Sequence, residues 1–543
     1  MSILGLSLEL LQEIACWIPA RSDQKQLRLV CRSLKDTVAP SFFSCVLLDL
    51  YSSRLELGLS HLEELAMGDS PWSRFARTLT IKNLSLPLDL DQPKKNDEDN
   101  EPKLAEVRLE KCLNKALKSL RNVRTVRWTF MAEHYYSEHS KWIPGVVADS
   151  IVTLPVLDDL RLTSDEPSFG RNFDCYFDRL TGLRTLTLAS SDPVDLHFIC
   201  VALSHAVHSS PLSSLRLTTE HHGTSSPLNG IADLFPSLPQ PLALTELRLT
   251  GCNLRLDHGT LPHLRSLRSL WLSYSSGKIW ETLRIECIHL SEIHTDYVQQ
   301  ALLEYMSSYS GLERLTISGA DETNQGDEDD GDEGDGDEDD SDKEHLEPLA
   351  EEFFTTALPR HKGSLVALSC RGVWEGKWSF GAHNVDLLSQ LHRLKSLRMN
   401  VNVVSAGYAP PVTVNRGSGR GRRELFEIER DSADRNLVHR FLDLINELHI
   451  MDAAILPAAP LRYRKSSCGN PIIRHKEIVI GAIDAAVREF KTSASGISRA
   501  LSAVVLAGHS FYKMDYGADK YRAFESLNLS WPYSYEGLLE EHE

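Results

Sequence analysis

Several features are scarce in this 543-residue chain, and each shortage argues against a class of protein. Its ten cysteines are scattered without a Cys-x-x-Cys pair, which argues against a small disulfide-rich secreted scaffold and indicates reduced thiols. No apolar run approaches the roughly eighteen residues of a membrane-spanning helix. The first twenty residues lack a basic start and contain Glu9 and Glu13, so they do not resemble a signal peptide. We therefore expect a soluble cytoplasmic or nuclear protein, or one found in both places, with no membrane partner.

The negative charge is concentrated in one segment. Residues 321–342 hold fourteen Asp and Glu side chains and no Lys or Arg, and so account for most of the formal net charge of −18. Such a segment buries little apolar area and repels itself, which predicts an acidic disordered loop over 319–346. A calcium loop is the alternative, because Asp335, Asp337 and Asp339 are suitably spaced, but Asp340 stands where that motif requires glycine.

Two further polar stretches, 91–103 and 405–424, predict surface loops. The second contains a basic cluster of Arg416, Arg420, Arg422 and Arg423. We interpret this cluster as solvated, with nuclear import or nucleic-acid contact as the alternative. We expect no nucleic-acid partner.

The first forty residues predict two short amphipathic helices. Ser7 is placed to cap a helix over 8–17, whose apolar stripe repeats at steps of four: Leu10, Ile14 and Ile18. After a turn at Pro19, Asp23 and Gln26 suggest a capping box for a second helix, with Arg28, Arg32 and Lys35 on its wet face. Its apolar stripe is Leu27, Val30, Cys31 and Leu34. Two such helices cannot bury both stripes alone, so the rest of the chain or another protein must cover the remainder.

This segment resembles an F-box. The resemblance rests on LSLELLQEI at 6–14, on Ile18-Pro19 and on LRLVCRSLKD at 27–36, although the family usually opens Leu-Pro where this chain has Leu6-Ser7. It implies docking of a Skp-type adaptor through Leu6, Ser7, Leu10, Ile14, Ile18, Pro19, Leu27, Val30, Cys31 and Leu34. The alternative is an ordinary helical hairpin that caps the next domain.

Short Leu-x-Leu motifs recur along the rest of the chain. The regular motifs lie 22 to 32 residues apart and begin at Leu160, Leu186, Leu215, Leu247, Leu270, Ile293 and Leu315. Looser ones begin at Leu79, Val126, Leu368, Leu397 and Leu448. Residues 244–254 read LTELRLTGCNL and match LxxLxLxxCxL at every fixed position. The pattern resembles leucine-rich repeats, in which each unit gives one strand and a returning helix or loop, and stacking buries the leucines.

Together these resemblances imply an α/β fold class, with an N-terminal helical F-box followed by an irregular leucine-rich-repeat solenoid, or horseshoe, of about a dozen units. The expected domains are an F-box over 1–48, irregular first repeats over 49–150, leucine-rich repeats over 151–318, the acidic loop over 319–346, and further irregular repeats with a C-terminal cap over 347–543.

Between the two inward leucines of each motif, one residue points outward onto the expected concave face. This row reads Arg161, Thr187, Arg216, Arg248, Trp271, His294, Thr316, Ser369, Arg398 and His449. We interpret six of these residues as a client-binding surface for carboxylates or phosphates: Arg161, Arg216, Arg248, Trp271, His294 and Arg398. The alternative is a solvated ladder, because Asp159, Glu246 and Glu292 lie two positions earlier and could neutralise neighbouring arginines.

No catalytic, metal or cofactor site is predicted. Ser510 follows an apolar run, as in the nucleophile elbow of an α/β-hydrolase, but Tyr512 replaces the glycine that the strained turn requires. Four histidines lack the cysteine or carboxylate ligands that would complete a zinc site at finger spacing: His205, His208, His221 and His222.

An F-box followed by repeats is similar to the F-box/LRR class of ubiquitin-ligase receptors. This similarity implies a non-enzymatic substrate receptor of an SCF-type cullin-RING ubiquitin ligase, which holds a client for protein degradation by raising the effective concentration of its lysines. One alternative is a non-catalytic leucine-rich-repeat interaction scaffold outside the ubiquitin system. A serine hydrolase that depends on Ser510 is the third hypothesis.

Overall fold

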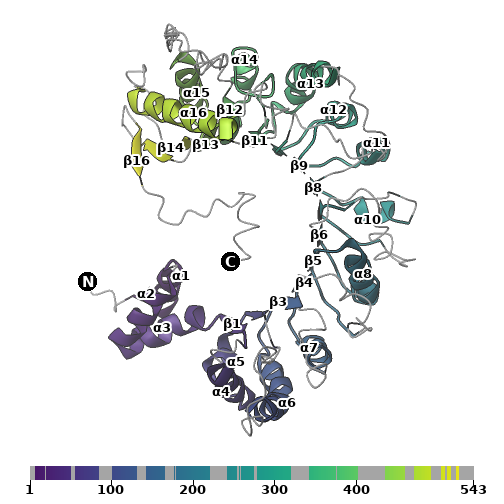
Figure 1. The fold of residues 1–543 in the computed structure, drawn as a ribbon, viewed down its shortest axis with the longest axis vertical. Helices are drawn as coiled ribbons and strands as arrows, with labels where there is room; N and C mark the ends of the chain where they lie inside the picture. The colour runs from purple at the N-terminus through teal and green to yellow at the C-terminus, as the bar shows by residue number, and fades with distance from the viewer. Residues whose placement is uncertain are drawn as a thin grey trace, which may run out of the picture. The chain divides into compact units, whose positions relative to one another are not determined.

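The computed structural model describes much of the chain between residues 6 and 524. The described residues are 6–18, 20–50, 55–82, 84, 101–130, 142–164, 177, 179–219, 241–252, 256, 259–273, 278–319, 341–372, 374, 376–401, 435–458, 470–490, 503–507, 510–514 and 521–524. The chain forms two compact units, one of residues 1–267 and 273–275 and one of residues 268–272 and 276–543. Both units are mixed α/β, with helices along one face of a mostly parallel sheet (Figure 1).

Three helices open the first unit: α1 (Leu8–Cys16), α2 (Arg21–Val30) and α3 (Arg32–Phe42). The predicted cap of the first helix is confirmed, because the Leu10 N–H donates to Ser7 Oγ at 3.4 Å. α3 packs against both α1 and α2. Leu11 of α1 and Leu34 and Val38 of α3 are buried.

The second predicted helix is wrong in its extent. It begins at Arg21 after Ala20, which makes no side-chain cap, and Asp23 lies inside its first turn. The helix ends before Cys31, whose extended backbone (φ −160°, ψ 168°) separates α2 from α3. A stripe at i, i+3, i+4 and i+7 fits one continuous helix or two successive short ones, so the sequence pattern alone did not reveal the break.

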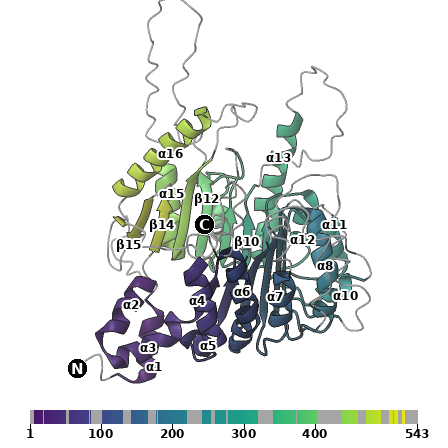
Figure 2. The ribbon, with the colours of Figure 1, turned by 60° about the horizontal axis from the view of Figure 1, so that its bottom comes forward.

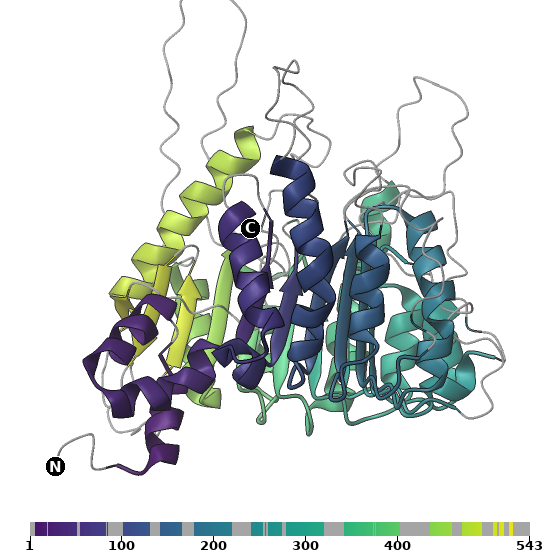
Figure 3. The same cartoon turned by 90° about the horizontal axis from the view of Figure 1, so that it is seen from below.

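The first unit carries a parallel sheet whose strands pair in chain order. Its strands are β1 (Cys45–Leu48), β2 (Thr78–Ile81), β3 (Thr125–Phe130), β4 (Asp159–Ser164), β5 (Thr185–Ser190), β6 (Ser214–Thr219) and β7 (Glu246–Thr250). Its other helices are α4 (Leu55–Ala66), α5 (Pro71–Phe75), α6 (Glu101–Ser119), α7 (Ile143–Ile151), α8 (Pro193–His208) and α10 (Leu261–Leu264). α4 packs against α6 and α6 against α7, as Figures 2 and 3 show. Each strand is thus followed by a crossover that returns the chain to a parallel neighbour.

The leucines of the predicted motifs form the core of this unit. One column in register across β2 to β7 consists of Leu79, Val126, Leu160, Leu186, Leu215 and Leu247. Each of them is at most 1% exposed. Burial of such a side chain contributes roughly 1.5–3 kcal/mol, so the column is a major source of stability. The prediction that these motifs are strands with inward leucines is confirmed.

The second unit continues the pattern and ends differently. Its parallel strands are β8 (Ser269–Leu272), β9 (Glu292–Thr295), β10 (Arg314–Ile317), β11 (Ala367–Cys370), β12 (Ser396–Val401), β13 (Asp452–Pro457) and β14 (Ala503–Ala507). Two antiparallel strands follow: β15 (Ser510–Met514) and β16 (Arg522–Phe524). Its helices are α11 (Lys278–Ile285), α12 (Gln300–Ser307), α13 (Ser341–Glu352), the π-helix η5 (Phe353–Ala357), the 3₁₀-helix η6 (Leu358–His361), α14 (Val385–Leu388), α15 (Arg435–Leu448) and α16 (Asn470–Glu489).

The last predicted motif is wrong. Leu448 ends α15, and His449 follows it with a left-handed backbone (φ 56°). The strand is β13, in which Ala454 pairs with Arg398 in the row position predicted for His449. The prediction also missed β1 at the start of the sheet. Its inward residues, Val46 and Leu48, are buried as in the later strands.

Most predicted loops lie largely or wholly outside the described residues. These are the stretches 91–103 and 405–424, which contain the basic cluster, and most of the acidic segment. The end of the stretch 91–103 overlaps α6, which begins at Glu101, and the end of the acidic segment overlaps α13, which begins at Ser341. Among the helices in the described parts of the chain, none combines the length and apolar character that a bilayer crossing requires.

One buried histidine bonds to backbone groups in the core of the second unit. His361 Nδ1 accepts a hydrogen bond from the Leu312 N–H at 3.3 Å, and its Nε2 donates to Met306 O at 3.1 Å. The Tyr309 ring packs edge-on against it at 5.1 Å. Burial lowers the pKa of His361 to about 4, so this side chain is neutral near pH 7.

Candidate functional site

Large apolar side chains are exposed on the N-terminal helices. The set is Leu6, Leu8, Leu10, Ile14, Trp17, Leu29 and Val30, and we call it the N-terminal apolar surface. Leu10, Ile14 and Trp17 are spaced four and three residues apart and therefore share one face of α1. Trp17 is 79% exposed and Val30 is 69% exposed. Exposed apolar clusters of this kind mark interaction sites in soluble proteins.

The structure divides the ten predicted adaptor residues by burial. Five are exposed: Leu6, Ser7, Leu10, Ile14 and Val30. Ile18, Leu27 and Cys31 are half-buried, and Leu34 is buried. Pro19 lies outside the described residues. The break at Cys31 places Val30 on α2 and Leu34 on α3, so these two residues do not share one stripe.

Arg28 has a role that the sequence did not reveal. It was expected on the wet face of the second helix, but its guanidinium lies over the rings of Phe42 and Phe43, 4.3 and 4.4 Å from their centroids. This cation–π packing joins α2 to the end of α3. Phe43 in turn meets Trp72 of α5 edge-on at 4.9 Å, which connects the helices to the body of the unit.

The predicted row also exists within each unit. In the first unit, Arg127, Arg161, Thr187, Arg216 and Arg248 occupy matching positions on successive strands. In the second unit the row is Trp271, His294, Thr316, Ser369, Arg398 and Ala454. Arg127 is an additional member, carried by a motif that the sequence analysis classed as irregular.

Acidic side chains pair with the arginines of the row in the first unit. Arg161 lies 3.4 Å from Asp159, and Glu246 bonds both Arg216, at 3.1 Å, and Arg248. Burial favours a higher pKa for Glu246, but Arg248 and Arg216 outweigh it and hold this pKa below its usual value. Arg161, Arg216 and Arg248 therefore each have an acidic neighbour, as the solvated-ladder alternative predicts.

Two residues of the row in the second unit also have acidic neighbours. Arg398 lies 3.2 Å from Asp452, which is contributed by the neighbouring strand β13. His294 Nε2 lies 3.1 Å from Glu292 Oε1. The ring of Trp271 stacks on His294 with centroids 3.5 Å apart. The six predicted client residues thus engage their own neighbours, and they belong to two separately described units.

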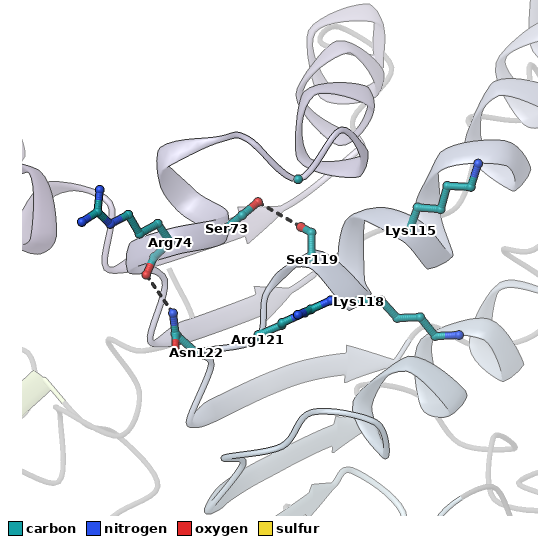
Figure 4. A pocket seen from close by; sticks show the side chains of 8 residues that line it. Ser73, Arg74, Lys115, Lys118, Ser119, Arg121 and Asn122 are labelled. Atoms are coloured by element: carbon teal, nitrogen blue, oxygen red, sulfur yellow. Dashed lines mark hydrogen bonds between the residues drawn. The ribbon is translucent and has the colours of Figure 1, made fainter.

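A basic depression lies between α5 and the end of α6 in the first unit, and the sequence analysis missed it. Its volume is about 520 Å³, and its lining is Gly68, Ser73, Arg74, Lys115, Lys118, Ser119, Arg121 and Asn122. In Figure 4, Ser73 Oγ lies 3.0 Å from Ser119 Oγ, and Asn122 Nδ2 donates to Arg74 O at 2.9 Å. The charged ends of Arg74, Lys115 and Lys118 point in different directions. They do not converge on a single ligand position.

The environment of Ser510 does not match a nucleophile elbow. An elbow places the serine between a strand and a helix. Here Ser510 begins β15, which returns antiparallel to β14 and pairs Ser510 with Ala507. The hydrolase hypothesis therefore loses its structural premise.

The histidines considered for zinc are only partly described. His205 is exposed on α8. His221 and His222 lie outside the described residues, as do Asp335, Asp337 and Asp339 of the calcium alternative. Within the described ranges, no three His, Cys, Asp or Glu side chains gather as a set of metal ligands.

Comparison with known proteins assigns no family to this chain. No protein-family model matches it, and no curated protein matches its sequence. The functional argument therefore rests on the geometry of its own residues.

Proposed function

We propose that this chain is the substrate-recognition subunit of an SCF-type cullin-RING ubiquitin ligase. Its N-terminal helices act as an F-box that docks a Skp-type adaptor, and its strand–helix units act as a leucine-rich-repeat solenoid that holds a client protein. The observation that carries the proposal is the N-terminal apolar surface, which coincides with the segment that resembles an F-box. A partner that covers this surface gains roughly 25 cal/mol for each Å² of apolar area removed from water.

In this proposal the receptor forms no covalent bond with its client. A recruited conjugating enzyme transfers ubiquitin, and the receptor supplies proximity. Two properties support such a division of labour. α1 and α2 present apolar side chains outward, while the strand–helix units repeat one architecture whose surface residues vary from strand to strand.

The second candidate is a repeat scaffold outside the ubiquitin system, in which the N-terminal helices only cap the sheet. The contact between Phe43 and Trp72 favours this candidate, because it ties the helices to the body. α3 also packs against α5. A cap, however, buries its apolar residues against the body, whereas Trp17, Leu29 and Val30 point to solvent.

The deciding experiment is size-exclusion chromatography of the purified full-length chain with a purified Skp-type adaptor. We expect a one-to-one complex, in which the adaptor slows amide hydrogen exchange in α1 and α2. Separate elution of the two proteins at micromolar concentrations would contradict the proposal and leave the scaffold candidate. Slowed exchange in the sheet alone would contradict the assigned surface.

A further inference from the structure

The outer edge of β1 is unpaired within the described part of the first unit. Ser44 O accepts from Arg77 N–H and Thr78 N–H, and Leu48 O accepts from Lys82 N–H, so the even residues of this segment bond toward β2. Successive residues of a strand direct their backbone groups to opposite sides. The N–H and C=O groups of Cys45, Leu47 and Asp49 therefore face away from β2.

An apolar groove runs along this edge. Its volume is about 650 Å³, and it lies between β1 and α4, with Arg21 of α2 and Trp72 of α5 also on its wall. Leu47 and Leu57 line it and are 57% and 54% exposed. Leu62 and Leu65 of α4 form its floor and are buried. Beside β2, the equivalent space holds the inward side chains of the preceding strand, Val46 and Leu48.

Asp49 provides a polar feature in this groove. Its Oδ1 is buried and has no hydrogen-bond partner among the described residues. Burial raises the pKa of Asp49, although the charge of Lys82 opposes this shift. A buried carboxylate oxygen without a partner is unfavourable, and a donor group brought by a ligand would satisfy it.

We propose that the edge of β1 and its groove bind an extended segment of a partner polypeptide, which adds a parallel strand to the sheet. Backbone groups of the segment pair with those of Cys45 and Leu47, alternate leucines enter the groove beside α4, and a lysine or arginine meets Asp49. Three observations identify this occupant. The exposed backbone groups of a strand edge are paired along their length only by another strand. The apolar groove favours apolar side chains, and the acceptor Asp49 Oδ1 favours a side chain that donates a hydrogen bond. The proposal is independent of adaptor binding.

The probe is a fluorescein-labelled seven-residue peptide that copies residues 184–190 of this chain with Ala189→Lys. In the sheet, Leu186 and Leu188 of β5 occupy the same register positions as Val46 and Leu48 of β1. A peptide bound in that parallel register therefore places its two leucines beside Val46 and Leu48, and its lysine beside Asp49. Binding to the full-length protein is measured by fluorescence anisotropy. We expect Leu47→Lys to weaken binding at least tenfold, since it places a charge on the edge.

The matched control is Thr80→Lys. Thr80 is the register partner of Leu47 one strand inward, so this variant adds the same charge to the same face without touching the edge. We expect less than a twofold change. Equal weakening by the two substitutions would overturn the proposal, as would absence of peptide binding to the wild-type protein. Thermal melting of both variants checks that each is folded.

Two further experiments separate strand addition from simple apolar binding, one with N-methylated peptides and one with the variant Asp49→Asn. N-methylation at alternate residues should abolish binding in one phase and spare it in the other, because only alternate N–H groups face β1. Asp49→Asn should weaken the lysine peptide at least threefold and leave the unsubstituted Ala189 peptide unchanged. Equal binding in both methylation phases, or equal effects of Asp49→Asn on both peptides, would overturn the assignment.

Discussion

The N-terminal apolar surface and the arginine row are both predicted contact surfaces, but their chemistry is opposite. Arginines of the row pair with acidic neighbours: Glu246 is shared by Arg216 and Arg248, and Asp452 pairs with Arg398. The apolar surfaces of Trp17 and Val30 stand in solvent, and only the indole N–H of Trp17 has a partner, Glu13 Oε1 at 3.3 Å. A polar side chain is satisfied by one well-placed partner, whereas an apolar side chain is satisfied only by burial. The stronger demand for a binding partner therefore lies on α1 and α2.

The largest expected effect is that of Val30→Glu on adaptor binding. In the proposed complex this substitution buries a carboxylate without a partner, which costs several kcal/mol. Each 1.4 kcal/mol is a tenfold loss of affinity, so we expect at least a hundredfold weakening, measured by titration calorimetry. Val30 is 69% exposed in the free chain, so the thermal midpoint should hardly change.

Ser22→Glu is the matched control for this substitution. Ser22 is exposed on the same helix, and the substitution adds the same charge outside the N-terminal apolar surface. We expect adaptor affinity to change less than threefold. If the Val30→Glu and Ser22→Glu variants bind the adaptor with equal affinity, the N-terminal apolar surface is not the docking site. Unfolding of the Val30 variant would favour the cap candidate.

Burial of His361 in the second unit makes its protonated form unfavourable. Its pKa is about 4 in the folded chain and about 6.5 when unfolded, so the unfolded state binds more protons between these values. Stability should therefore fall as the pH drops below 6.5, by roughly 2 kcal/mol at pH 5 through this group. The measurement is urea unfolding at pH 7 and pH 5.

His361→Gln keeps a hydrogen-bonding side chain that does not titrate. We expect the variant to be less stable than wild type at pH 7 but to lose less on acidification. The change in unfolding midpoint between pH 7 and pH 5 is compared for the wild type and the variant. Equal changes in the two proteins would contradict the assigned burial of His361.

Removal of both arginines around Glu246 tests whether the row is a ladder or a client site. Arg216→Ala combined with Arg248→Ala leaves this half-buried carboxylate without its two cations, and we expect a loss of about 1–2 kcal/mol in unfolding free energy. Addition of Glu246→Gln should recover part of that loss. Full stability together with loss of client capture would reverse the comparison and make the row the binding surface.

Ser7→Pro has the smallest expected effect. Ser7 has φ −64°, which proline adopts without strain, but its Oγ caps α1 by accepting from the Leu10 N–H. Loss of a cap costs about 1 kcal/mol, and the lower entropy of the unfolded chain offsets part of it. We expect the unfolding free energy to fall by less than 1 kcal/mol. A larger fall would mean that the cap supports more than α1.

Prediction succeeded for most strands in which bulky apolar residues alternate. Leu186 and Leu215 identified their strands because a buried face at period two requires such residues. It failed at β13, where Ala453 and Ala454 contribute little to that pattern, and at β1, which precedes the first recognised motif. For the helices, the position of α1 was predicted from its cap and its stripe. The break at Cys31 was missed because two short helices in sequence preserve much of the same spacing.

Local sequence determined the inward leucines and the outward row, because both follow from alternation of side chains along single strands. Even Glu246 was recognised as a neighbour of the arginines, since it lies two residues from Arg248 on the same face. Tertiary structure decided which charged side chains are paired and which strand edge stays exposed. Asp452 pairs with Arg398 because β13 lies next to β12. Arg28 is half-buried because α3 places Phe42 and Phe43 beside its guanidinium. The outer edge of β1 is unpaired within the described residues because β1 is the first strand of the sheet. Such contacts join residues that are far apart in the sequence or lie on separate elements, so no local pattern encodes them.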